Sequence, residues 1–187
     1  MEQKYHLQKT VSLFIFSILL HTFSLLGQSV KPDSAQIILH SAITEAQSSK
    51  RNVLIIFHAT WCKWCTPLET ALNDTTVKPL IDKNYVITMI DVMEREDKIQ
   101  TYENPGGKNL LSDFGGDNAG LPFMVFLDGK GKMIANSNVM PQKQNIGYPN
   151  SNEEIEAFVN LLKETAPHMT GKQREVIRSY FERLTPQ

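Results

Sequence analysis

The chain has 187 residues, of which 41% are hydrophobic, and this is enough for one buried core without stabilising cross-links. Its 19 basic and 20 acidic residues give a formal net charge of −1, which argues against nucleic acid as a partner. With no internal repeat and no low-complexity segment, the sequence predicts a single globular domain.

Residues 1–28 are predicted to be a signal peptide. Two lysines precede an apolar run of 16 residues from Val11 to Leu26, and small residues follow near residues 27–29. A membrane anchor is the alternative, but a spanning helix needs about 20 apolar residues. The C-terminal LTPQ is not a retention signal. We therefore expect cleavage near residues 27–29 and a location in the periplasm or outside the cell.

Residues 29–187 are predicted to form one domain in which helices and strands alternate. Removal of residues 1–28 leaves 17 basic and 19 acidic residues, since Glu2, Lys4 and Lys9 are lost. Apolar residues at helical spacing predict helices, and short β-branched runs predict strands. In chain order these are a helix from Ser34 to about residue 49, a strand over 52–57, a helix over 62–72, a short helix or turn over 75–84, a strand over 85–92, a helix near 107–114, strands over 121–127 and 132–137, and helices over 152–166 and 171–184.

The order of these elements predicts an α/β fold with a central mixed sheet of four to five strands. The strands over 52–57 and 85–92 are joined through a helix, so we expect them to be parallel with a right-handed crossover. The strands over 121–127 and 132–137 are joined by an Asp-Gly-Lys-Gly turn, so we expect an antiparallel hairpin. Helices should cover both faces, and the helix over 171–184 is an extra element at the C-terminus.

The only two cysteines lie in the segment HATWCKWCTP, residues 58–67, directly after the first predicted strand. Outside the cytoplasm cysteines are expected to be disulfide-bonded. A disulfide across three residues closes a minimal loop and stabilises a fold little, because its entropic effect grows with loop length. The pair Cys62 and Cys65 is therefore better suited to chemistry than to structure.

The spacing of the two cysteines gives them different environments. Cys62 is expected at the N-terminus of the second predicted helix, where unpaired N–H groups and the helix dipole stabilise an anion and lower a thiol pKa to about 3.5–7.5. Cys65 follows one turn later, within the roughly 4.4–6.8 Å between Cα atoms that a disulfide spans. Lys63 adds positive charge, and Trp61 and Trp64 offer an apolar surface suited to a flexible peptide.

A strand, Trp-Cys-x-x-Cys and a helix together resemble the thioredoxin superfamily, and more narrowly its secreted thiol–disulfide interchange proteins. The resemblance covers about residues 52–165, through VLIIFHATWCKWC, VITMIDV and GLPFMVFLDGKGKMI. It implies a thioredoxin fold in which Pro122 is cis and packs against the disulfide, whereas Leu121 offers its backbone to an extended substrate. An ordinary strand-opening proline is the alternative for Pro122.

Two positions depart from the family pattern. Ile56 stands where the family often has a buried acid that handles the proton of the second cysteine, so the proton must use water or another side chain. Lys63 and Trp64 replace the Gly-Pro of thioredoxin itself, in a dipeptide that tunes the redox potential in the family.

The sequence leaves more than one role possible for a histidine near the cysteines and for a cluster of acidic residues. His58, four residues before Cys62, could pair with a thiolate or join a metal site, but a packing role is favoured because the family commonly has an aromatic residue there. The acidic residues Glu94, Glu96 and Asp97 are expected to form a solvated loop.

The sequence therefore predicts a secreted thiol–disulfide oxidoreductase. Cys62 attacks a substrate disulfide, and Cys65 resolves the mixed disulfide. No cofactor is expected, the partners are protein thiols or disulfides, and a reductase outside the cytoplasm would need electrons from a membrane redox partner. One alternative is a copper or zinc module built from the cysteine pair and His58, although structural zinc usually has four protein ligands. The other is a redox-inactive interaction domain with the same fold.

Overall fold

The computed structural model describes residues 31–166 and 168–184. The chain divides into two units, Met1–Lys31 and Pro32–Gln187, and the second is the one described below. The predicted signal peptide and its cleavage site lie outside the described residues. Within the part that is described, no helix combines the length and the apolar character needed to cross a membrane.

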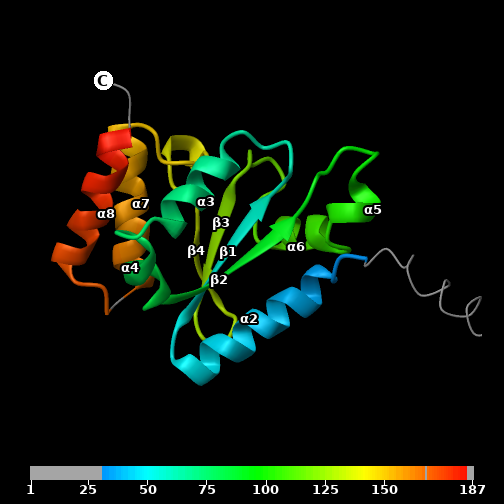
Figure 1. The fold of residues 1–187 in the computed structure, drawn as a ribbon, viewed down its shortest axis with the longest axis horizontal. Coiled ribbons are helices and arrows are strands. Elements are labelled where there is room, and N and C mark those ends of the chain that lie inside the picture. The colour runs from blue at the N-terminus through cyan, green and yellow to red at the C-terminus, as the bar shows by residue number, and fades with distance from the viewer. Residues whose placement is uncertain (1–30, 167, 185–187) are drawn as a thin grey trace, which may run out of the picture. The chain divides into compact units, whose positions relative to one another are not determined.

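Four strands form one mixed sheet in the middle of the second unit (Figure 1). They are β1 (Asn52–His58), β2 (Tyr85–Asp91), β3 (Phe123–Leu127) and β4 (Met133–Asn136), in the spatial order β2-β1-β3-β4. Strand β1 pairs in parallel with β2 and antiparallel with β3, and β3 pairs antiparallel with β4. Both the predicted parallel pair and the predicted hairpin are confirmed.

Helices cover both faces of this sheet. On one face lie α2 (Ala35–Ser49) and α6 (Gly107–Asp113). The other face is covered by α3 (Cys65–Asn73), α4 (Lys78–Asp82), α7 (Asn152–Thr165) and α8 (Gly171–Leu184). The remaining helical turns are α5 (Ile99–Tyr102) and a 3-10 turn over Pro141–Lys143. The predicted α/β architecture, with its additional C-terminal helix, is confirmed.

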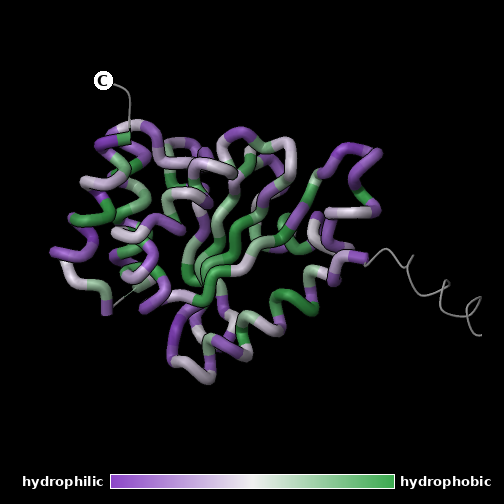
Figure 2. Tube along the Cα trace, in the orientation of Figure 1, coloured by the Kyte–Doolittle hydropathy of each residue, from purple (hydrophilic) through white to green (hydrophobic). Residues whose placement is uncertain are grey.

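Alternation along β1 separates two hydrophobic cores. Leu54 and Ile56 face the helices α3, α7 and α8, whereas Ile55 and Phe57 face α2 and α6. All four are fully buried, as expected for a central strand with helices on both faces. Figure 2 shows this hydrophobic centre surrounded by helices of mixed hydropathy. The same alternation places His58, the last residue of β1, on the α3 side.

Helix α3 begins three residues later than predicted. Cys65 is its first residue and Trp64 its N-cap, so Cys62 lies in the loop before the helix. Pro67 falls in the first turn, where its missing N–H would have no helical partner in any case. The helix α5 is a single turn that no apolar periodicity could have indicated.

Serine side chains cap α2 and α7. Ser34 Oγ accepts from the Ile37 N–H at 3.4 Å, and Ser151 Oγ accepts from the Glu154 N–H at 3.2 Å. The Glu154 carboxylate in turn accepts from the Asn150 N–H at 2.9 Å, one residue before the position that a capping box uses. This bond ties the start of α7 to the loop that precedes it.

Candidate active site

The two cysteines form a disulfide beyond the C-terminal end of β1. Their Cα atoms are 5.4 Å apart. The Cys65 N–H donates to the Cys62 sulfur at 3.2 Å and to the Cys62 carbonyl at 3.3 Å. No side-chain hydrogen bond from the N-cap residue Trp64 caps α3, and the Cys62 sulfur accepts from the first N–H of the helix. Although Cys62 precedes the helix, the positive end of the α3 dipole therefore points at its sulfur.

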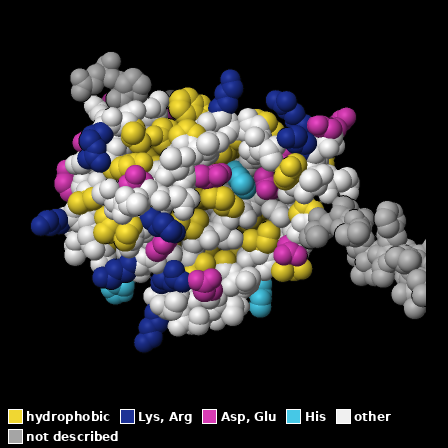
Figure 3. All heavy atoms as spheres, viewed as in Figure 1, with side chains coloured by type: hydrophobic (Ala, Val, Ile, Leu, Met, Phe, Trp, Pro, Cys, Tyr) yellow, Lys and Arg dark blue, Asp and Glu magenta, His cyan; other side chains and the backbone are white. Residues whose placement is uncertain are grey.

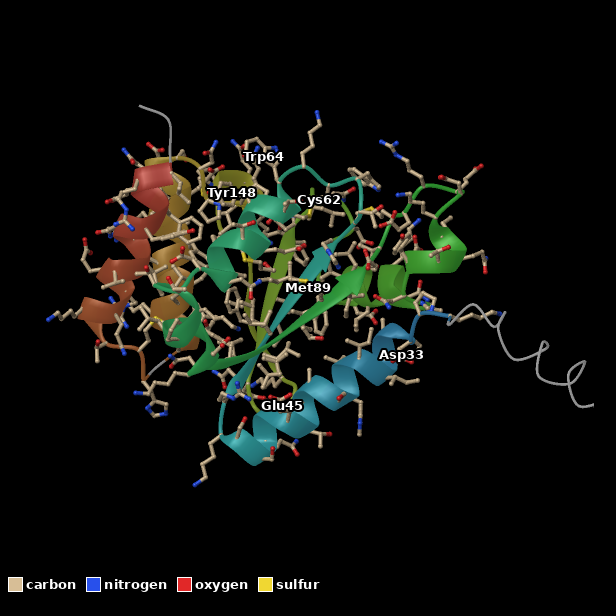
Figure 4. All side chains as sticks on the ribbon, in the orientation of Figure 1. Asp33, Glu45, Cys62, Trp64, Met89 and Tyr148 are labelled. Atoms are coloured by element: carbon tan, nitrogen blue, oxygen red, sulfur yellow. A yellow bond between two sulfur atoms is a disulfide. The ribbon has the colours of Figure 1, made fainter. Side chains whose placement is uncertain are left out.

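Two exposed tryptophans flank the disulfide. Trp61 is 43% exposed and donates from Nε1 to the Met93 carbonyl at 2.7 Å. Trp64 is 54% exposed and stacks on Tyr148, with ring centroids 6.0 Å apart and planes 13° from parallel. Figure 4 shows Trp64 and Tyr148 together on the α7–α8 side of Cys62. The cysteines themselves are at most 5% exposed in this oxidised state, and Lys63 between them is exposed.

The segment before β3 faces the disulfide. The Leu121–Pro122 peptide bond is cis, as predicted. Leu121 packs against Ala59 and both cysteines. Neither its N–H nor its carbonyl forms a hydrogen bond with another of the described residues.

Asn145 holds this segment in place, and the sequence analysis missed it. Its Nδ2 donates to the carbonyls of Gly120 at 2.6 Å and Pro122 at 2.9 Å. Its Oδ1 accepts from the Ser137 hydroxyl at 2.6 Å and from the Gly147 N–H at 3.1 Å. Both donors and both acceptor sites of the amide are used, which fixes its orientation. No local pattern marks this residue, because its partners are brought to it by the loop after β4.

Two hollows meet at Leu121 and Gly147, beside the disulfide. The smaller, of ≈ 240 Å³, has an aromatic wall made by Trp64 and Tyr148. The larger, of ≈ 710 Å³, is mainly polar. Its amide side chains are those of Asn118, Asn138, Gln142, Gln144 and Asn145. Together they form a groove with an aromatic wall in one arm and amide side chains in the other.

Glu94 is buried, so the prediction of a solvated acidic loop is wrong for this residue. It is 7% exposed, whereas Glu96 and Asp97 are exposed as expected. The Glu94 carboxylate accepts from the Thr60 N–H at 2.5 Å and from the Thr60 hydroxyl at 2.8 Å. These bonds offset the cost of removing the carboxylate from water. They also fix the residue that precedes Trp61, a role that sequence reasoning did not find.

His58 lies between two carboxylates. Its Nδ1 is 3.0 Å from Glu69 Oε1, and its Nε2 is 3.5 Å from Asp91 Oδ2. Burial raises the pKa of Asp91 and outweighs the lowering by His58, and the negative charges of Glu94 and Glu69 raise it further. Within residues 31–166 and 168–184, no group of three or more His, Cys, Asp or Glu side chains is placed to hold a metal ion. The metal-module alternative therefore gains no support.

Comparison with known proteins places this geometry in a family. Residues 35–129 match the model of the thioredoxin-like family. A disulphide isomerase from Xylella fastidiosa Temecula1 is 20% identical over 81% of this chain and 92% of that one, with a TM-score of 0.48. A thioredoxin from Thermus thermophilus is 20% identical over 75% and 94%, with a TM-score of 0.44. The oxidised C-terminal domain of DsbD from Neisseria meningitidis is 20% identical over 56% and 84%, with a TM-score of 0.41.

The family model spans just over half of the chain and includes the two cysteines. Its span also contains β1, β2, β3 and the cis bond before Pro122. This chain therefore belongs to the thioredoxin-like family, with the Cys-x-x-Cys disulfide that makes it a thiol–disulfide oxidoreductase in general class.

Proposed function

We propose that this protein is an exported oxidoreductase that exchanges disulfides with protein substrates, with Cys62 as the nucleophile and Cys65 as the resolving cysteine. The observation that carries the proposal is the Cys62 sulfur, which accepts the first N–H of α3 at 3.2 Å. In the reduced protein this N–H and the helix dipole favour the thiolate at Cys62, and the thiolate is the attacking species.

The exchange balances without a cofactor. The Cys62 thiolate attacks a substrate disulfide, a bond forms between Cys62 and one substrate sulfur, and the other substrate sulfur leaves as a thiolate. Cys65 then loses its proton and attacks Cys62. This step forms the Cys62–Cys65 disulfide and releases the second substrate thiolate. Two electrons pass from the cysteine pair to the substrate, and the reverse sequence oxidises a substrate dithiol.

The groove favours an extended polypeptide as substrate. Leu121 lies next to the cysteines, and no described residue pairs with its N–H or its carbonyl, so a substrate strand can pair with it by backbone hydrogen bonds. We assign Trp61, Lys63, Trp64, Leu121 and Pro122 to substrate binding. Residues flanking the substrate cysteine would lie on the Trp64–Tyr148 wall on one side and in the amide-lined hollow on the other.

Export is proposed from the leader-like residues 1–28, with residues 29–187 as the mature domain. Outside the cytoplasm the cysteine pair meets oxidants, so catalytic turnover as a reductase requires electrons from a membrane redox partner. Protein thiols and disulfides are the proposed partners.

Trapping variants test the proposal. Cys65→Ser retains the nucleophile and loses the resolving sulfur, so covalent complexes with substrate proteins should accumulate. Cys62→Ser should trap nothing and lose exchange altogether, because a hydroxyl does not replace the thiolate at neutral pH. The full chain is expressed in its host, and complexes are separated without reductant and identified by mass spectrometry.

A matched control variant and two outcomes test the assigned roles of the cysteines and the proposed export. The double variant Cys62→Ser/Cys65→Ser sets the background, and added reductant should release every genuine complex. Equal trapping by Cys62→Ser and Cys65→Ser would contradict the assigned roles. Trapped partners drawn only from cytoplasmic proteins would contradict export.

A further inference from the structure

The resolving cysteine needs a proton acceptor that the usual position does not supply. Ile56 is fully buried among apolar side chains on the α3 side of the sheet, so no acid lies there. Cys65 is 2% exposed, which limits its access to bulk water. Its thiol must nevertheless lose a proton before the sulfur can attack Cys62. The proton acceptor should therefore be a titratable side chain on the same side of the sheet as Cys65.

Three such side chains are brought together by the fold, and we name them the His58 triad: Glu69, His58 and Asp91. His58 and Asp91 are paired residues at the ends of the parallel strands β1 and β2, so their side chains emerge on the same face. That face is the α3 side, as shown by Ile56, two residues before His58. Glu69 follows Cys65 by four residues, which places their Cβ atoms about 5–6 Å apart on one face of α3.

The contacts within the His58 triad favour one proton more than a neutral imidazole provides. Both ring nitrogens face carboxylate oxygens, at 3.0 Å for Glu69 and 3.5 Å for Asp91. A neutral imidazole has one N–H, so two ionised carboxylates can be satisfied only by the imidazolium, or by a proton on one carboxyl. The His58 triad is thus built to hold a proton that moves among three adjacent groups.

The electrostatic surroundings agree with this proton count. Asp91 Oδ1 is buried and has no hydrogen-bond partner in the described part of the chain. Glu94 from the loop after β2 and Glu69 from α3 repel the ionised Asp91 carboxylate, and the Glu94 side chain also favours a protonated Asp91 by a hydrogen bond between the two carboxyl groups. Together with burial they raise the pKa of Asp91, against the lowering by His58. A proton taken up here relieves a concentration of negative charge.

We propose that the His58 triad exchanges the Cys65 proton when the mixed disulfide is resolved, in place of an acid at position 56. The proposal rests on the proposed function. The Cys65 proton passes to the His58 triad through Glu69, while the Cys65 sulfur forms its bond to Cys62 and the substrate sulfur leaves with the bonding electron pair. In the reverse direction the His58 triad returns the proton to the Cys65 thiolate. His58 acts through Glu69 and is therefore a positioning residue that stores the proton.

The first test compares two histidines. His58→Gln keeps a polar side chain but does not titrate, and His40→Gln, at an exposed position of α2, is the matched control. Rapid-mixing kinetics with a peptide disulfide separate attack by Cys62 from resolution by Cys65. For His58→Gln we expect resolution at neutral pH to slow by about 100-fold with a changed pH profile, whereas attack keeps its rate. His40→Gln should match the wild type in both steps.

A second measurement needs no substrate, so its result does not depend on the proposed function. In a Cys62→Ser background the Cys65 thiolate is titrated by its ultraviolet absorbance, with and without His58→Gln. The substitution should shift the titration, and the double change His58→Gln/Glu69→Gln should shift it no further than the larger single change, because the residues act as one unit. An unchanged Cys65 titration would overturn the proposal, even if the protein exchanges disulfides well.

Rescue provides the check against a merely structural role for His58. Ile56→Asp in the His58→Gln background places an acid at the position where the family often has one. This acid can accept the Cys65 proton in place of the His58 triad, so it should restore part of the resolution rate. Circular dichroism confirms folding, and His58→Phe, which keeps an aromatic ring, is the second variant should His58→Gln unfold. Equal losses in attack and in resolution, with no rescue by Ile56→Asp, would contradict the proposal.

Discussion

Single side chains from distant loops hold both sides of the disulfide. Glu94, in the loop after β2, binds the N–H and hydroxyl of Thr60. Asn145, in the loop after β4, binds the carbonyls on either side of Leu121. Because the polar groups of Glu94 and Asn145 are hydrogen-bonded, burying them costs little stability while their bonds fix the groove. The geometry of the active site therefore depends on residues that take no part in the exchange.

Glu94→Gln should destabilise the protein, although the charge is removed from a buried position. An amide has one acceptor oxygen for the Thr60 N–H, and its NH₂ group can meet the Thr60 hydroxyl only by donating to it, so both charge-assisted bonds become neutral ones. Hydrogen bonds to a charged group contribute about 1.5–3 kcal/mol and neutral ones about 0.5–1.5 kcal/mol, so the two changes together cost about 1–3 kcal/mol. The free energy of unfolding, measured by urea denaturation of the oxidised protein, should fall by about that amount.

The neighbouring acidic residue is the control for this change. Glu96 is exposed, so Glu96→Gln should alter the free energy of unfolding by less than about 0.5 kcal/mol. Equal effects of Glu94→Gln and Glu96→Gln would show that the Thr60 bonds contribute nothing measurable.

Sequence reasoning located the functional residues that belong to a local motif. Cys62, Cys65 and Pro122 were placed by spacing and by resemblance, and the disulfide and the cis bond are both present. Glu94 and Asn145 escaped because their partners lie 34 and 23–25 residues away in the chain. For Glu94 the local sequence was misleading, since a run of acidic residues usually lies in solvent.

At the level of elements, α8 supports the aromatic wall of the active site. Phe181 of α8 lies 5.4 Å from the Phe158 ring of α7 and 5.8 Å from the Tyr148 ring, measured between centroids. Tyr148 in turn stacks on Trp64. The C-terminal helix, expected only as an addition to the fold, is thus joined by a continuous row of rings to the tryptophan between the cysteines.

Phe181→Ala should disturb both stability and the active site. Phe181 is 1% exposed, and removing a buried phenylalanine ring costs about 3–5 kcal/mol. The Tyr148 ring loses a neighbour, so the fluorescence of Trp64 should change as well. Val176→Ala is the control, because Val176 is also in α8 but is 38% exposed. A large loss of stability without any change in tryptophan fluorescence would show that α8 does not support the aromatic wall of the active site.

Periodicity located most elements and failed where the signal is short. The strands and the helices α2, α7 and α8 carry a repeating apolar pattern that tertiary packing requires, so their positions followed from the sequence. The first residue of α3 did not follow from the sequence. The distance between the Cα atoms of Cys62 and Cys65 is similar whether Cys62 lies in a loop or in the first helical turn. The apolar pattern of Leu68, Ala71 and Leu72 fits a helix but does not mark its first residue.

Across the whole domain, charge is nearly balanced and dispersed. The chain carries 19 basic and 20 acidic residues, and Figure 3 shows both kinds interspersed on the drawn face. Exposed pairs such as Lys78–Asp82 contribute little to stability and are screened by salt. The pH dependence of folding should therefore arise from a few groups held away from water, among which Asp91 is prominent.

Because of Asp91, the free energy of unfolding should fall as the pH rises from about 3.8 through the higher folded-state pKa of this side chain. Its folded-state pKa lies above the ordinary value of 3.8, chiefly because it is buried. Between the two values the native protein holds a proton that the unfolded chain has released, so stability falls as pH rises through this window and stays lower beyond it. Asp91→Asn removes the titration, and urea unfolding from about pH 4 to pH 8 should then give a flatter curve. Asp97→Asn, at an exposed position, should leave the wild-type slope unchanged. Parallel curves for Asp91→Asn and the wild type would mean that Asp91 is as readily ionised in the fold as in the unfolded chain.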